Sequence, residues 1–141
     1  MNQEIRILIA DDDAEDRFII SDAFREIGLQ EQISFAADGT EVISYLNDAV
    51  RQGIPPALIV LDLNMPKLNG TDTLRMLKAD DHLQDLPVVI FSTSVNELEK
   101  EECLRIGALE YLTKPVSYKD SITIARYFYE MAERLSGIAS H

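Results

Sequence analysis

The sequence predicts an α/β protein in which one parallel sheet is covered by helices on both faces. Five short apolar segments alternate with five longer amphipathic segments along the 141 residues, and this order of elements is typical of doubly wound folds. The apolar segments are nearly continuous, as expected for strands buried on both sides. The length suits one domain with a full hydrophobic core, so we expect residues 1–141 to form a single domain.

The first half of the chain contains two strand–helix units and a third strand. The helical segments have apolar residues three and four positions apart, and Gly or Pro follows each of them. In the first helix this spacing predicts four residues on the buried face: Phe18, Ile19, Ala23 and Ile27. The expected elements are strand 5–10, helix 14–27, strand 33–37, helix 40–50 and strand 57–62.

The second half follows the same alternation and ends in a long helix with two apolar stripes. The expected elements are helix 71–79, strand 86–92, helix 97–106, strand 108–113 and helix 118–135. The predicted core stripe of the last helix is Ile122, Ala125, Phe128 or Tyr129, Ala132 and Leu135. Tyr127 and Met131 lie on the second stripe with Ile124, and we expect these two to form a partner or homodimer face.

Composition excludes several classes of function. Thirteen basic and twenty-five acidic residues give a net charge of −12, which repels nucleic-acid phosphates and anionic lipid surfaces. No apolar run approaches the roughly 18 residues of a membrane span, and the N-terminus has no signal-peptide pattern. The single cysteine, Cys103, suits a reducing compartment, so we expect a cytoplasmic protein that binds neither nucleic acid nor membrane.

Polar residues follow four of the five predicted strands. For a sheet in the order 2-1-3-4-5, ligands bind beyond the carboxyl ends of the strands, between the first and third. Asp11 and Asp12 follow the first strand, and Asp62 ends the third. Ser92 ends the fourth strand, and Lys114 follows the fifth. The sequence therefore predicts three acids, a hydroxyl and a lysine at one rim of the sheet.

The three acids at this rim predict a metal site. Two carboxylates 4 Å apart repel by about 4 kcal/mol at an effective dielectric constant of 20, so Asp11, Asp12 and Asp62 require a proton or a cation. An oxygen-rich site of this kind favours Mg²⁺. Asp13 and Asp16, at the start of the first helix, have a simpler interpretation as capping and helix-dipole residues.

Taken in order along the chain, these residues match a known family. The matching elements are the Asp11-Asp12 pair, LDLNMPKLNG around Asp62, Ser92, and YLTKP ending in Lys114-Pro115. Over almost its whole length the chain resembles a receiver domain of the response regulators of two-component systems. The resemblance implies a flavodoxin-like (βα)5 fold and a role as a phosphoprotein in phosphorelay signal transduction.

The resemblance also implies roles at the acidic rim. Asp62 would accept a phosphoryl group from a histidine kinase, forming an aspartyl phosphate. Asp12, Asp62 and the backbone carbonyl of Asn64 would bind Mg²⁺ directly, and Asp11 would act through a metal-bound water. The chemistry would be self-phosphotransfer and autodephosphorylation, without turnover of another substrate.

The remaining implied roles concern the signal. Lys114 would bind a phosphoryl oxygen, and the bond between Lys114 and Pro115 is expected to be cis. Ser92 and Tyr111 match the switch pair of the family. Their movement would remodel the face formed by the fourth helix, the fifth strand and the last helix.

The expected partners are a sensor histidine kinase or phosphotransfer protein and, through the last helix, a second copy or a downstream protein. Only six residues follow the last helix, so we expect a stand-alone receiver without an output domain. The segment NDAVRQGIPPA resembles the stand-alone regulators of bacterial phytochrome kinases. Two alternatives remain: a Mg²⁺-dependent phosphatase with an aspartyl nucleophile, and an adaptor of receiver fold that works without phosphate.

Overall fold

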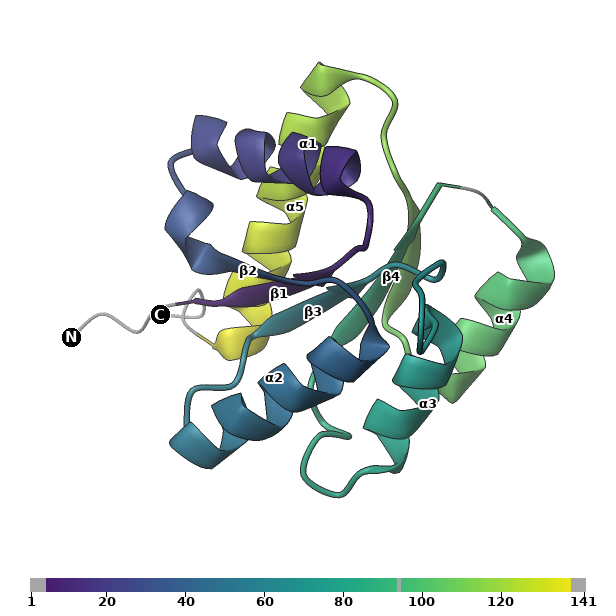
Figure 1. Cartoon of the computed structure of the whole chain (residues 1–141). Helices are drawn as coiled ribbons and strands as arrows, with labels where there is room; N and C mark the ends of the chain where they lie inside the picture. The colour runs from purple at the N-terminus through teal and green to yellow at the C-terminus, as the bar shows by residue number, and fades with distance from the viewer. Residues whose placement is uncertain (1–4, 94, 138–141) are drawn as a thin grey trace.

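Five parallel strands form the sheet, in the predicted order β2-β1-β3-β4-β5. The computed structural model describes residues 5–93 and 95–137 (Figure 1). Each strand has only four or five residues, and those of β1, β3 and β4 are buried throughout. The strands are β1 (Ile7–Ala10), β2 (Ile33–Ala36), β3 (Leu58–Leu61), β4 (Val88–Ser92) and β5 (Glu110–Thr113). The predicted strands are one or two residues too long at several ends because flanking apolar residues extend the pattern beyond the hydrogen-bonded ladder.

Helices cover both faces of the sheet, as predicted. The helices are α1 (Ala14–Glu26), α2 (Gly39–Gln52), α3 (Gly70–Ala79), α4 (Glu97–Ile106) and α5 (Tyr118–Ser136), with a short 3₁₀ turn η1 (Gln30–Gln32). Helices α1 and α5 pack against each other on one face, and α2, α3 and α4 lie on the other (Figure 1). Two hydrophobic clusters result, one on each side of the sheet.

Strand register brings the site residues to one edge. Ala10 at the end of β1 is opposite Leu61 at the end of β3. The backbone N–H of Asp62 donates to the carbonyl of Ala10 at 3.0 Å, so the chain that follows β3 leaves the sheet beside Asp11. The two acids are therefore placed next to each other by backbone pairing, before any side-chain contact.

The buried face of α1 differs from the predicted one. Ile20, Ala23 and Phe24 are buried, whereas Phe18 is 68% exposed and Ile19 is 40% exposed. The run of apolar residues from 18 to 20 is compatible with two helix faces, and packing against α5 selects the one that buries the large Phe24 side chain.

Helix α5 also faces the core differently from the prediction. Met131 is buried, and Leu135 is 44% exposed, so the assignment of Met131 to a partner face is wrong. Tyr127 is half-buried, and its hydroxyl donates to the Glu110 carboxylate on β5. The core ring on α5 is Phe128, which meets Phe91 edge-to-face with ring centroids 5.2 Å apart. That contact sets the rotation of α5 and turns Met131 inward.

Within the described residues, no helix combines the length and apolar character needed to cross a bilayer.

Candidate functional site

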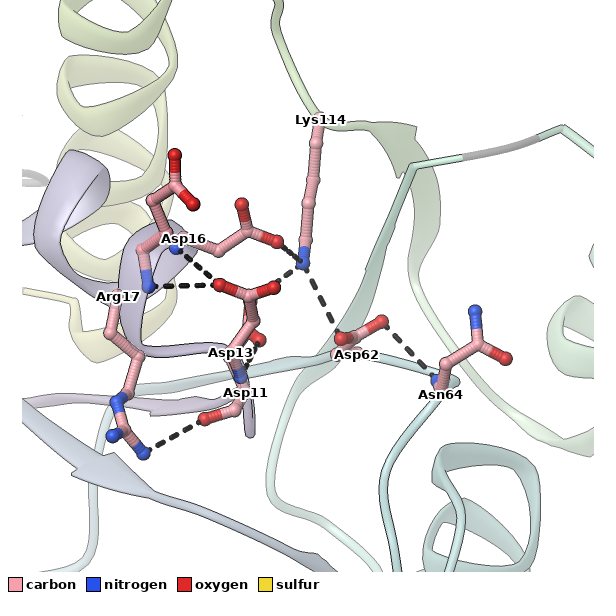
Figure 2. Close-up of polar contacts among 8 residues, drawn as sticks. Asp11, Asp13, Asp16, Arg17, Asp62, Asn64 and Lys114 are labelled. Atoms are coloured by element: carbon pink, nitrogen blue, oxygen red, sulfur yellow. Dashed lines mark hydrogen bonds and ion pairs between the residues drawn. The ribbon is translucent and has the colours of Figure 1, made fainter.

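Side chains that follow three strands, β1, β3 and β5, converge above the carboxyl edge of the sheet (Figure 2). Asp11 follows β1, Asp62 follows β3, and Lys114 follows β5. Ser92 is the last residue of β4, and its carbonyl accepts from the backbone N–H of Lys114 at 2.7 Å. The predicted acids and lysine thus meet at this rim, and Ser92 ends the neighbouring strand, while the role of its hydroxyl remains a prediction.

The three predicted acids form one group of oxygen donors. Asp11, Asp12 and Asp62 each offer a carboxylate oxygen, and these oxygens lie within 4.8 Å of one another. Asp11 and Asp62 are buried, and Asp12 is exposed. Hard cations such as Mg²⁺ take oxygen ligands and retain several waters, so a half-open set of three carboxylates fits such an ion.

Lys114 is the cation opposite these acids. Its Nζ lies 2.6 Å from Asp11 Oδ2, 2.9 Å from Asp16 Oδ2 and 3.4 Å from Asp62 Oδ2, and its side chain is only 8% exposed. Burial lowers the pKa of Lys114, but the hydrogen bonds to Asp11 and Asp16 and the charge of Asp62 outweigh it and raise the pKa. The lysine therefore remains charged throughout the physiological range.

Asp62 has the opposite balance. Burial raises the pKa of its carboxyl group, and the charge of Asp11 raises it further, while Lys114 and the N–H of Asn64 act in the other direction. The net effect is a pKa above the ordinary value of an aspartate. A carboxylate that is both buried and beside another acid is held at a cost in free energy, which is common at functional sites.

Asp16 belongs to the site, although the sequence predicts only a capping and helix-dipole role for it. Its carboxylate reaches Lys114 from the first turn of α1 (Figure 2). Asp13 is the N-cap of α1, as predicted, and accepts from the N–H groups of Glu15 and Asp16. The sequence indicates which residue starts the helix. The contact between Asp16 and Lys114 depends instead on how α1 packs against the sheet, which the sequence pattern does not give.

Replacing Asp13 by Ala is expected to lower the free energy of unfolding by about 1 kcal/mol, since the cap is lost. Asn96→Ala is the matched control, because Asn96 caps α4 through two similar hydrogen bonds away from the acids. Urea denaturation of the two variants should give similar losses. A gain of stability in Asp13→Ala would mean that repulsion from the neighbouring acids outweighs the cap.

The loop after β3 turns the chain around the acids. The N–H of Asn64 donates to Asp62 Oδ1 at 3.3 Å, and Asn64 itself is exposed. Gly70 starts α3, and its N–H donates to the carbonyl of Leu63 at 2.9 Å. Asn69 caps the helix by accepting from the N–H of Asp72. The turn residues that follow Asp62 therefore close a loop from Leu63 to Gly70 that lies against the backbone of Asp62.

Two predictions about β5 have different outcomes. The bond between Lys114 and Pro115 is trans, since the described residues include no cis peptide, so the expected cis bond is wrong. A trans X–Pro bond is the lower-energy form by about 0.5–1 kcal/mol, and Lys114 reaches the acids with it.

Tyr111 is buried on β5 opposite Ile90, in the core that includes Cys103 of α4. Its role as a switch remains a prediction.

Comparison with known protein families gives one match that spans most of the chain. Residues 7–126 match the family model described as the response regulator receiver domain. This range contains all five strands and the first nine residues of α5.

Curated relatives are similar over most of this chain but are longer proteins. A protein-glutamate methylesterase/protein-glutamine glutaminase of Bacillus subtilis is 37% identical over 93% of this chain and 34% of its own length. The two-component response regulator ARR7 of Arabidopsis thaliana is 32% identical over 98% of this chain and 69% of its own length. The chain thus spans about a third of the first relative and two thirds of the second.

Solved structures show the same fold over chains of similar extent. The phosphorylated cyanobacterial phytochrome response regulator RcpA has a TM-score of 0.80 at 28% identity, covering 91% of this chain and 93% of that one. The response regulator RPA3017, in red light signalling of R. palustris, has a TM-score of 0.78 at 28% identity, covering 89% and 91%.

Proposed function

The chain belongs to the response regulator receiver domain family, and from that premise we propose that it accepts a phosphoryl group on Asp62. The donor would be a sensor histidine kinase or a phosphotransfer protein. Receiver domains are signalling domains that interact with such proteins. The single observation that carries the proposal is the position of Asp62, buried at the end of a central strand, grouped with Asp11 and Asp12 and 3.4 Å from the Lys114 ammonium.

In the proposed reaction, one oxygen of the Asp62 carboxylate attacks the phosphorus of the donor. A new O–P bond forms, the bond from phosphorus to the donor imidazole or acyl oxygen breaks, and its electron pair stays with the donor. The product is an acyl phosphate on Asp62. The acyl phosphate is a mixed anhydride, and its phosphoryl oxygens carry more negative charge than the carboxylate it replaces, so the reaction depends on the positive charge around Asp62.

The neighbouring groups would hold the phosphoryl oxygens. Lys114 is buried, charged and 3.4 Å from Asp62, so it is placed to bind a phosphoryl oxygen as a point charge. Ser92 lies at the end of the adjacent strand and would donate its hydroxyl. Asp12, Asp62 and the Asn64 carbonyl would hold Mg²⁺, with Asp11 acting through water, and the bound ion would neutralise charge on the transferred group.

Signalling would follow from a change around β4 and β5. We propose that Ser92 and Tyr111 form the switch pair and that the face made by α4, β5 and α5 meets the next protein or a second copy. Tyr127 is bound to Glu110, the neighbour of Tyr111 on β5, so a shift of β5 would reach α5. The similarity to the phytochrome response regulator RcpA favours a phytochrome-type kinase as the donor.

The test is the intact mass of the protein after incubation with acetyl phosphate and Mg²⁺. The expected result is the gain of one phosphoryl group, prevented when EDTA removes the metal. Borohydride reduction converts an aspartyl phosphate to homoserine, and peptide mass spectrometry should find that change at residue 62. No gain under any condition, or a gain at another residue, contradicts the proposal.

A further inference from the structure

We propose that Asp16 is a positioning residue that holds the Lys114 ammonium back from the Asp62 carboxylate and so keeps that carboxylate available to the phosphoryl donor. The inference rests on the proposed function of Asp62 and adds to it a residue that the sequence assigns to helix capping and dipole effects.

The contacts of Lys114 are unequal. Figure 2 shows its side chain ending between Asp16 on α1 and Asp62 after β3. The Nζ is 2.9 Å from Asp16 Oδ2 but 3.4 Å from Asp62 Oδ2, and its shortest contact is with Asp11 at 2.6 Å. An ammonium group has three donors, and two of the three are held on the side of Asp11 and Asp16. The ammonium is therefore drawn away from the proposed nucleophile.

Asp16 differs from the other acids because it is not one of the predicted cation ligands. Asp11, Asp12 and Asp62 form the group that would share a cation, and Asp16 is outside that group. Its side chain is 32% exposed, so its position is set mainly by the backbone of α1 and less by surrounding side chains. When a cation and a phosphoryl group occupy the other acids, Asp16 is the carboxylate whose charge stays directed at Lys114.

Close packing does not hold the ammonium on the side of Asp16. A cavity of about 40 Å³ adjoins Lys114 there, and its lining includes Asp11 and Asp16 but not Asp62. The Phe91 ring lies beneath the ammonium, with its centroid 5.9 Å from Nζ. Without the Asp16 contact, the carboxylates left near Nζ are Asp11 at 2.6 Å and Asp62 at 3.4 Å. The distance from Nζ to Asp62 would then shorten, and the ammonium would mask the nucleophile.

The experiment is a double-mutant cycle on the rate of phosphorylation. The rate constant with acetyl phosphate at saturating Mg²⁺ is measured by intact mass for the native protein, Asp16→Asn, Lys114→Met and the double variant. Asp16→Glu tests whether the carboxylate alone restores the rate. Glu15→Gln is the matched control, since it removes one exposed acidic charge from the same helical turn.

Asp16→Asn is expected to slow phosphorylation by about threefold to tenfold, the range typical of coupled neighbouring side chains. Asp16→Glu should recover most of the rate, and Glu15→Gln should leave it within about twofold. In the Lys114→Met background the Asp16→Asn change should have almost no effect, because Asp16 acts through the lysine.

The inference is overturned if Asp16→Asn matches the native rate, or if it slows the Lys114→Met protein by the same factor as the native one, which would indicate a general loss of charge. Absence of phosphoryl uptake in the native protein is a different result. It would overturn the proposed function of Asp62, and the role of Asp16 with it.

Discussion

Replacing Asp62 by Asn is expected to abolish phosphoryl uptake and, in the metal-free protein, to raise the free energy of unfolding at neutral pH. Both effects have one origin. The Asp62 carboxylate is buried beside Asp11, so its negative charge is costly in the folded state. Asn has the same size without the charge, and Lys114 keeps its two shorter contacts, to Asp11 and Asp16.

The pH dependence follows from the direction of the pKa shift. Burial, reinforced by Asp11, raises the pKa of Asp62 in the folded protein above its value in the unfolded chain. Folding then favours the protonated form, and the stability that this form contributes is lost as the pH rises through the folded pKa. The native protein should therefore lose stability relative to Asp62→Asn with rising pH, and the difference should be smallest below about pH 4.

Urea denaturation of both proteins in EDTA, at acidic and neutral pH, tests this expectation. We expect Asp62→Asn to be more stable by roughly 1 kcal/mol at neutral pH, a typical gain when a functional residue is replaced. Added Mg²⁺ should narrow or reverse the difference, because a ligand stabilises the protein that binds it more tightly. A variant less stable than the native protein at neutral pH would mean that the contact with Lys114 outweighs the cost of burial.

The sequence predicts the rim of the site better than its interior. Strand ends are marked by the change from apolar to polar residues, and parallel strands bring such ends to one edge, so Asp11, Asp62 and Lys114 follow from the pattern alone. The contact between Asp16 and Lys114 joins residues 98 positions apart and depends on how α1 crosses the sheet. Periodicity contains no information on that crossing.

The helix faces show a related limit. In α1, the three consecutive apolar residues 18–20 are compatible with more than one buried face. Packing of Phe24 against α5 determines which of them is buried. In α5, the spacing predicts Leu135 in the core and Met131 on the second stripe, but Met131 is buried and Leu135 is 44% exposed. The amphipathic pattern predicts that a helix has a buried face, and neighbouring elements determine its edges.

Gly70 is the position in the site loop where a single methyl group should have the largest effect. A Cβ placed there would lie 2.2 Å from the carbonyl oxygen of Asp62 and 2.6 Å from the Cα of Leu63. Both are backbone atoms, so the clash cannot be relieved by rotating a side chain. Gly70→Ala is expected to lower the free energy of unfolding by about 3 kcal/mol, at the upper end of the usual cost of overpacking.

The comparison with Gly53→Ala separates close approach from backbone conformation. Gly53 has a φ of +76° but no atom within 4 Å of an added Cβ, so alanine there should cost only about 1–2 kcal/mol of left-handed strain. In a helix, alanine is more favourable than glycine by about 1 kcal/mol. A large loss of stability in Gly70→Ala would therefore come from the steric clash and not from helix propensity. Urea denaturation should give a much lower free energy of unfolding for Gly70→Ala than for Gly53→Ala, and equal losses would contradict the steric argument.

Because relief of the clash must move the backbone at Asp62, the rate of phosphoryl uptake should also fall about tenfold in folded Gly70→Ala. Gly53→Ala should retain the native rate.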